Sequence, residues 1–253
     1  MTILNHHSAS LLPYICLDDA VHLILEKKSF DYKVPFFDGA LNFIGGNWLS
    51  EDNSPEDTVR REVLEEFWSL DEEYEPLNAL LRQKFLPVEA RVDVRLPSEI
   101  VGVFKELGPR LLKKFDYAGD FKVGVYSPVA DPAIFYGASV FANHMSLEDY
   151  AHLKMLIEVF SGRLTTDNWK HGSSIVDVTL KEINEKNMKF AWGYDKIINS
   201  LLRSGKLKGS SSGVIRTLDL VDVKRLPVGF VDRTRSGVPT YAGLEQKYKY
   251  VGR

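Results

Sequence analysis

A glycine pair followed by a capped acidic helix is the feature that most constrains this 253-residue chain. Gly45-Gly46 precedes Ser54, whose side chain can accept a hydrogen bond at a helix N-terminus. Pro55 suits the first helical position, and Asp57 stands three residues after Ser54. The sequence therefore predicts a helix that begins at Pro55, shortly after a glycine turn.

The predicted helix separates an apolar face from an acidic one. An apolar residue recurs every four positions from Val59 to Phe67. Another face carries three glutamates, Glu62, Glu65 and Glu66. Like charges four residues apart destabilise a helix by roughly 0.2–0.5 kcal/mol, so this face requires either solvent or a cation. Two interpretations stay open, a solvated acidic surface or a site for a hard cation such as magnesium, which takes oxygen ligands and shares them with phosphates.

Residues 46–70 resemble the box of the Nudix hydrolases, usually written G-x5-E-x7-R-E-U-x-E-E-x-G-U, with U a bulky aliphatic residue. Gly46 matches the first glycine, and the run from Arg61 to Glu66 matches the R-E-U-x-E-E core, with one extra residue between the two parts. Counted from the arginine, Asn53 stands in place of the first glutamate, and Trp68 stands in place of the late glycine.

The resemblance implies a site for Mg²⁺ or Mn²⁺. Its implied metal ligands are the carbonyl of Gly46 and the carboxylates of Glu62, Glu65 and Glu66. Arg61 would orient these carboxylates. Glu62 would act as ligand or general base, so that Glu62, Arg61 and Glu66 form the implied catalytic set.

Nudix enzymes often recruit a further carboxylate from a late loop or helix. The acidic residues here that could serve are Glu148, Asp149, Glu158 and Asp167. Asp167 is favoured because it lies in a loop before a predicted strand, and the alternative for each of the four is an ordinary surface acid.

The fold that the resemblance implies is α/β in the broad sense (α+β), a Nudix-like mixed sheet sandwiched between helices. Residues 1–204 would form this domain, with an insertion after the box helix at about 71–120. Residues 205–253 would be a linker, rich in Gly, Ser and Lys at its start, and a C-terminal extension. That extension could fold against the domain, complete a homodimer or contact substrate.

Apolar periodicity and turn residues predict the individual elements. Strands are expected at 11–17, 21–25, 40–44, 88–96, 121–126, 135–142, 175–178 and 214–223. Besides the box helix, helices are expected at 77–84, within 97–114, from 147 to about 161, from 180 and at 190–202. Gly108-Pro109 interrupts the segment 97–114, so two short helices are predicted there.

Composition limits the partners. The formal net charge of -3 and the pI near 6.1 offer no bulk attraction for nucleic acid or an anionic membrane. No apolar run approaches the roughly 18 residues of a membrane span, and the amino terminus lacks the pattern of a signal peptide. Cys16 is the lone cysteine, so no intramolecular disulfide is available, and a cytoplasmic location is expected.

The function that the resemblance implies is metal-dependent hydrolysis of a pyrophosphate bond by attack of water on phosphorus. The substrate would be a nucleotide-derived small molecule, a nucleoside diphosphate linked to another moiety. ADP-ribose, dinucleoside polyphosphates, nucleotide sugars and nucleoside triphosphates all remain candidates. The alternative is a catalytically silent nucleotide-binding or regulatory module of the same fold, which Asn53 and Trp68 favour.

Overall fold

The structure is a computed structural model that describes residues 6–30, 37–49, 51–67, 98–125, 134–165, 168, 172–207, 215 and 221–226. Its strands are β1 (His6–Leu17), β2 (Ala20–Lys27), β3 (Leu41–Asn42), β4 (Ile44–Asn47), β5 (Asp116–Val125), β6 (Ile134–His144), β7 (Ser174–Thr179) and β8 (Val221–Leu226). Its helices are α1 (Pro55–Glu66), α3 (Ser98–Lys113), α4 (Leu147–Phe160), α6 (Leu180–Glu185) and α7 (Tyr194–Arg203).

The strands form one mixed sheet. The order along it is β3-β2-β1-β6-β5-β8, with β4 paired to β1 and β7 paired to β2. β1 and β6 are parallel, whereas β1 pairs antiparallel with β2 at one end and with β4 at the other. β1 and β2 therefore separate beyond their paired ends, and β4 pairs with β1 while β3 pairs with β2 where they separate.

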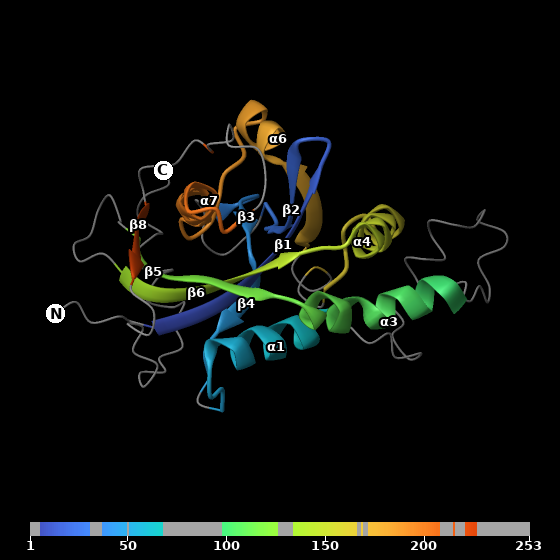
Figure 1. Ribbon diagram of the computed structural model, residues 1–253, viewed down its shortest axis with the longest axis horizontal. Coiled ribbons are helices and arrows are strands. Elements are labelled where there is room, and N and C mark those ends of the chain that lie inside the picture. The colour runs from blue at the N-terminus through green and yellow to red at the C-terminus, as the bar shows by residue number, and fades with distance from the viewer. Residues whose placement is uncertain are drawn as a thin grey trace.

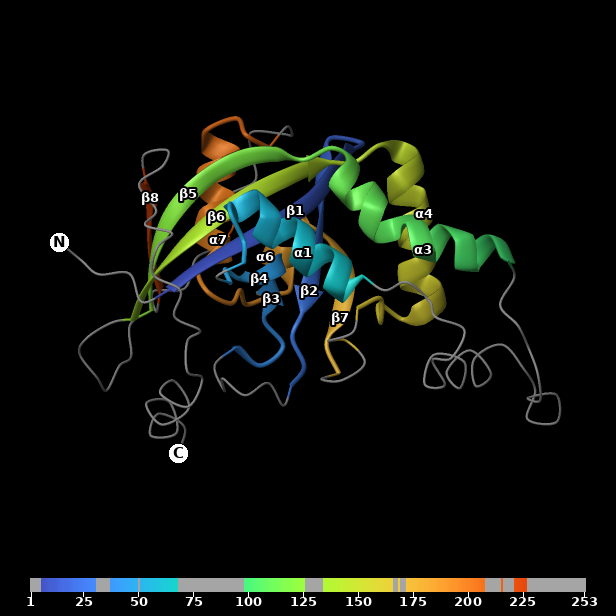
Figure 2. The ribbon, with the colours of Figure 1, turned by 90° about the horizontal axis from the view of Figure 1, so that it is seen from below.

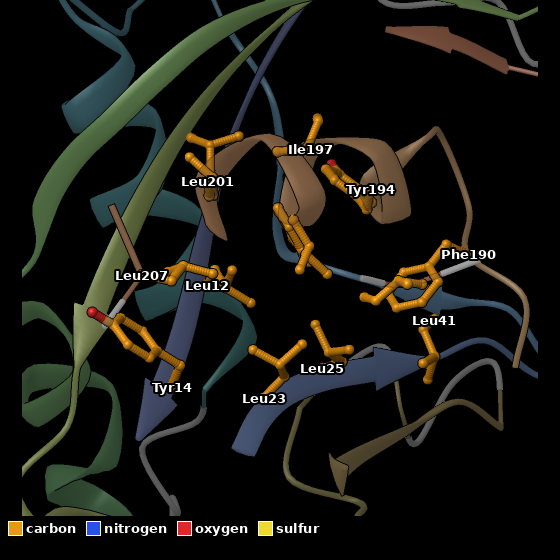
Figure 3. Close-up of a cluster of buried hydrophobic side chains, with 14 of the residues drawn as sticks. Leu12, Tyr14, Leu23, Leu25, Leu41, Phe190, Tyr194, Ile197, Leu201 and Leu207 are labelled. Atoms are coloured by element: carbon orange, nitrogen blue, oxygen red, sulfur yellow. The ribbon is translucent and has the colours of Figure 1, made fainter. Parts of the chain in front are cut away.

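Helices cover both faces of this sheet (Figure 1). α6 and α7 lie on one face, where Tyr194 and Ile197 join Leu12 and Leu23 in a buried cluster (Figure 3). α1, α3 and α4 contribute to a second buried cluster, with Val59 of α1 in it. The predicted α+β architecture, a mixed sheet between helices, is confirmed.

Short-range signals predict several element ends correctly. Asp18 and Asp19 form the turn between β1 and β2 with φ of 47° and 62°, a conformation that aspartate tolerates better than most residues. The side chains of Ser54, Ser146 and Thr179 cap α1, α4 and α6 by accepting a hydrogen bond from a backbone N–H three residues later.

The prediction of two short helices within 97–114 is wrong. α3 is one continuous helix from Ser98 to Lys113, with Pro109 inside it. A proline inside a helix costs about 3 kcal/mol, because it removes a hydrogen bond and crowds the preceding turn. Phe104, Leu107 and Leu111 are almost completely buried in the α1 layer. Since each such side chain gains roughly 1.5–3 kcal/mol on burial, packing outweighs the cost of the proline.

Two of the expected elements, the helix at 77–84 and the strand at 88–96, lie outside the described residues. Of the strand expected at 214–223, residues 221–223 lie in β8, which pairs with β5; Ile215 is not in a strand, and residues 214 and 216–220 lie outside the described residues. No helix in the described part of the chain is both long and apolar enough to span a membrane.

The buried side chain of Asn199 helps to hold the chain after residue 204 against the domain. Asn199 of α7 accepts a hydrogen bond from the backbone N–H of Ile215 at 2.8 Å and donates one to its carbonyl at 2.7 Å. Leu207 and Ile215 are both buried in the cluster beneath α7. The chain after α7 thus contributes to the core as well as to the sheet.

We expect Asn199→Ala to lower the free energy of unfolding by about 1–3 kcal/mol, because it leaves the buried N–H and carbonyl of Ile215 unpaired. Urea denaturation followed by circular dichroism would measure the change. Asn53→Ala is the matched control, since Asn53 is exposed and its loss should cost less than about 0.5 kcal/mol. Equal stability of the two variants would contradict the anchoring role.

Candidate functional site

The two glycines of β4 bring backbone and side chains unusually close. Gly45 has φ of 147°, and a Cβ there would lie 2.3 Å from the carbonyl oxygen of Ala9. A Cβ at Gly46 would lie 2.3 Å from Oε2 of Glu62. The first glycine therefore allows β4 to lie tightly against β1, and the second leaves the space that the Glu62 carboxylate occupies.

The three glutamates of α1 differ in their surroundings. The side chain of Glu62 is 17% exposed, whereas that of Glu65 is 61% exposed. Burial raises the pKa of Glu62, and the hydrogen bond and charge of Arg61 oppose this only in part. Glu66 is half-buried. The acidic face is therefore not uniformly solvated, because Glu62 is pressed against the sheet.

Arg61 joins the helix to the loop before it. Its Nε and Nη2 donate to the two carboxylate oxygens of Asp52 at 3.0 and 2.9 Å, and Nη2 also donates to the carbonyl of Asn47 at 2.8 Å. Its Nη1 donates to Glu62 at 2.7 Å and to Glu65 at 3.2 Å. One guanidinium therefore contacts the loop, the end of β4 and two carboxylates of its own helix.

Asp52 is the residue that the sequence analysis missed as a partner of Arg61. It is buried, and besides the contacts to Arg61 it accepts hydrogen bonds from the hydroxyl of Thr58 and the N–H of Leu49. Burial alone would raise its pKa, but the hydrogen bonds from Arg61, Leu49 and Thr58 outweigh that effect, so the pKa of Asp52 lies below its ordinary value.

The spacing of the box contained a signal for Asp52. Counted from Gly46 rather than from Arg61, the position of the first box glutamate falls on Asp52, and the extra residue then lies between Asp52 and Arg61. Asn53, which the count from the arginine had placed there, is exposed. An acidic residue is thus present near this position, but it is bound to Arg61.

The donors around Glu62 suit a hard cation by their chemistry. The carboxylate oxygens of α1 are of the kind that Mg²⁺ and Mn²⁺ prefer as ligands. The space left by Gly46 holds the Glu62 carboxylate. Within the described residues, no three His, Cys, Asp or Glu side chains are grouped so that they could hold a metal ion.

The four residues proposed as a further carboxylate ligand lie in different places. Glu148 and Asp149 lie in the first turn of α4 and face Arg110 of α3 at 3.4 and 3.3 Å, and Glu158 is exposed farther along α4. Asp167 lies outside the described residues. Thr165 forms an isolated bridge with Phe67 at the end of α1.

Comparisons with known proteins find a likeness in structure only. No family model matches the chain, and no curated protein matches it. One solved structure, of Shewanella oneidensis NrtR, is 13% identical over 79% of this chain and 63% of that chain, with a TM-score of 0.42. A second structure of NrtR, in complex with a 27mer DNA, also matches, and this chain covers 60% of its length. The chain therefore spans less than two thirds of NrtR in both structures.

Two further matches are described as Nudix proteins. The NUDIX domain of Shewanella oneidensis NrtR, in complex with ADP ribose, is 13% identical over 82% of this chain and 91% of that chain, with a TM-score of 0.40. RenU, a Nudix hydrolase from M. smegmatis, is 11% identical over 73% of this chain and 77% of that chain, with a TM-score of 0.29. Both descriptions name the family that the box resembles.

We expect Asp52→Asn to destabilise the protein at pH 7 by on the order of 3 kcal/mol, since it leaves a partly buried arginine without its bidentate partner. The folded-state pKa of Asp52 is lowered, so its stabilising effect is present above the unfolded-state pKa and is lost as the pH falls through the folded-state value. The stability difference between wild type and variant should therefore shrink below about pH 4.

Urea denaturation between pH 2.5 and 7 would measure this difference. Glu56→Gln is the matched control, because Glu56 lies on the same helix and forms only an exposed pair with Arg60. That substitution should change stability by less than about 0.5 kcal/mol at any pH. A pH-independent loss in Asp52→Asn would show that shape, and not charge, is what Asp52 supplies.

Proposed function

We propose that this protein is a pyrophosphohydrolase that uses Mg²⁺ or Mn²⁺ to cleave a nucleoside diphosphate linked to another moiety. Water would attack phosphorus, giving a nucleoside monophosphate and a phosphorylated second product. The observation that carries the proposal is the Glu62 carboxylate, which lies against Gly46 in a space that any side chain at that position would fill.

The burial of Glu62 is difficult to explain as a structural device. Taking a carboxylate out of water is unfavourable unless it is paired, and Glu62 shares its partner Arg61 with the buried Asp52, so one guanidinium faces two largely buried carboxylates. A solvated acidic helix face would leave Glu62 as exposed as Glu65. Its position beside the glycine turn instead suits a group that meets a cation or the attacking water.

Each residue can then be given a role. Glu65 and Glu66 would hold the metal, together with the carbonyl of Gly46, and Asp167 remains the proposed additional ligand. Glu62 would be ligand or general base, and Arg61 would set its orientation through the hydrogen bond at 2.7 Å. When bound, the divalent ion would neutralise the charge of the pyrophosphate and lower the pKa of water.

A second function is favoured by a specific observation. Arg61 contacts both Glu62 and Glu65, and an uncharged residue, Asn53, stands in the loop beside Asp52. Such an arrangement neutralises part of the acidic face without a metal. A nucleotide-binding or regulatory module that has lost hydrolysis would retain this geometry, and it would bind nucleotides without turnover.

We expect Glu62→Gln to lower kcat by roughly 10²–10⁴-fold, the usual contribution of a positioned general base. The assay would follow formation of the nucleotide product and of the phosphorylated second product from ADP-ribose, UDP-glucose, diadenosine tetraphosphate and ATP, with Mg²⁺ or Mn²⁺. Glu56→Gln, on the exposed side of the same helix, should keep wild-type rates. Binding of a nucleotide by the wild type without any release would instead establish the silent module.

Gly46→Ala tests the space that Glu62 occupies. The added Cβ meets the flexible end of Glu62 and not the backbone, so the carboxylate should be displaced while the fold is retained. We expect at least a tenfold loss of turnover with a stability change below about 1 kcal/mol. Gly102→Ala on α3 is the control, since a Cβ there meets nothing within 4 Å. Full activity of Gly46→Ala would contradict the assigned geometry.

A further inference from the structure

A second polar cluster lies where β2 meets β3. Glu26 and Asn42 are opposite each other in the register of these strands, and both are more than nine-tenths buried. Nδ2 of Asn42 donates to the Glu26 carboxylate at 3.3 Å, and the ammonium of Lys28 forms an ion pair with the same carboxylate oxygen. A buried charged cluster is thus built around one asparagine side chain.

The amide of Asn42 has only one orientation that suits its neighbours. Its Nδ2 also donates to the carbonyl of Phe43 at 2.9 Å, so both of its N–H groups face acceptors. Turning the amide over would set its oxygen against Glu26 and the carbonyl of Phe43. In the observed orientation, Oδ1 of Asn42 is buried and has no hydrogen-bond partner. An unpaired buried acceptor is costly, and it requires an explanation.

Asn42 lies on the same face of the sheet as the candidate site. Side chains of successive strand residues point to opposite faces. Leu41 and Phe43 belong to the cluster beneath α7, whereas Ile44 belongs to the cluster beneath α1. Asn42, Ile44 and Gly46 therefore project toward α1 from one continuous stretch of chain.

The direction of α1 carries the acidic face toward Asn42. Arg61, in the middle of the helix, is hydrogen-bonded to the carbonyl of Asn47, and the helix ends at its C-cap, Phe67. Phe67 bridges to Thr165. Three residues before Thr165, the carbonyl of Gly162 accepts a hydrogen bond from Ile175, which pairs with Glu26. The second half of the helix thus leads from β4 toward the part of the sheet where β2 pairs with β7 and β3; Figure 2 shows the end of α1 on the side of β2 and β7.

Glu66 follows Glu62 by one helical turn, about 6 Å along the axis. Because α1 runs toward β3, Glu66 is displaced from Glu62 in the direction of Asn42. A ligand extending from Glu62 past Glu66 would be directed toward Asn42.

We infer that Asn42 determines substrate specificity, with Oδ1 accepting a hydrogen bond from an N–H or O–H of the nucleoside part of the substrate. This inference rests on the proposed nucleotide site. Phosphate oxygens are acceptors, so they do not satisfy Oδ1, whereas nucleobase amines and ribose hydroxyls do. Glu26, held by Lys28, is the positioning residue, since it keeps the N–H groups of Asn42 turned away from the ligand.

Isothermal titration calorimetry of the full chain with ADP-ribose, GDP-mannose and UDP-glucose, with Mg²⁺ present, tests the inference. Asn42→Ala should weaken binding of the preferred nucleotide roughly tenfold, the upper range for one neutral hydrogen bond. Asn143→Ala is the matched control, because Asn143 is a buried asparagine whose Nδ2 donates to Leu111. It should bind within twofold of the wild type.

Analogues of the preferred nucleotide, each with one hydroxyl or amino group replaced by hydrogen, separate direct contact from a structural role. For one analogue, wild type and Asn42→Ala should bind equally, whereas a structural defect would weaken all analogues alike and overturn the inference. A Mn²⁺ titration without nucleotide should be unchanged by Asn42→Ala. A change there would make Asn42 a cation ligand and would also overturn it.

Failure of this inference is distinguishable from failure of the proposed hydrolysis. If nucleotide binding depends on Asn42 but no turnover occurs, the inference is supported and the proposed hydrolase activity is excluded. Turnover with binding unaffected by Asn42→Ala retains the hydrolase and overturns the inference. If the wild type binds none of the three nucleotides, the nucleoside contact at Asn42 is overturned as well.

Discussion

The Arg61 guanidinium is the interaction on which the candidate site depends. It binds Asp52 with two hydrogen bonds, reaches the carbonyl of Asn47 at the end of β4 and contacts Glu62 on its own helix. The strand, the loop and the helix are therefore held together by one guanidinium group. Its planar fork of N–H groups suits bidentate pairing with a carboxylate better than the ammonium of a lysine would. The position of Glu62 over Gly46 follows from this arrangement, because loop and helix cannot shift independently.

Local chemistry in the sequence was sufficient to predict much of the fold. The strands at 11–17 and 21–25 and the cap of α1 at Ser54 were predicted from residues close together in the chain, and the structure confirms them. α3 was not predicted correctly, because the fate of Pro109 depends on which side chains its helix buries. Such burial is decided by α1 and the sheet, which the sequence of α3 does not contain.

The site was predicted less completely, for a related reason. The acidic residues of α1 were evident from their spacing, whereas the pairing of Asp52 with Arg61 was not predicted, because the box was counted from Arg61 and not from Gly46. Asn42 and Glu26 carry no motif at all. They meet only because β2 and β3 pair in one register, a long-range choice that a single sequence does not display.

One strand register places both ends of the candidate site. Asn42 and Gly46 face α1 together because they are four residues apart in an alternating stretch, so a slip of one residue would send both to the opposite face. Gly45 prevents that slip, since the carbonyl of Ala9 occupies the place where any Cβ would stand and only glycine adopts its φ readily. The first glycine of the pair thus fixes the register, and the second leaves the space for Glu62. The Gly45-Gly46 pair is therefore needed for the chemistry proposed at Glu62 as well as for the turn.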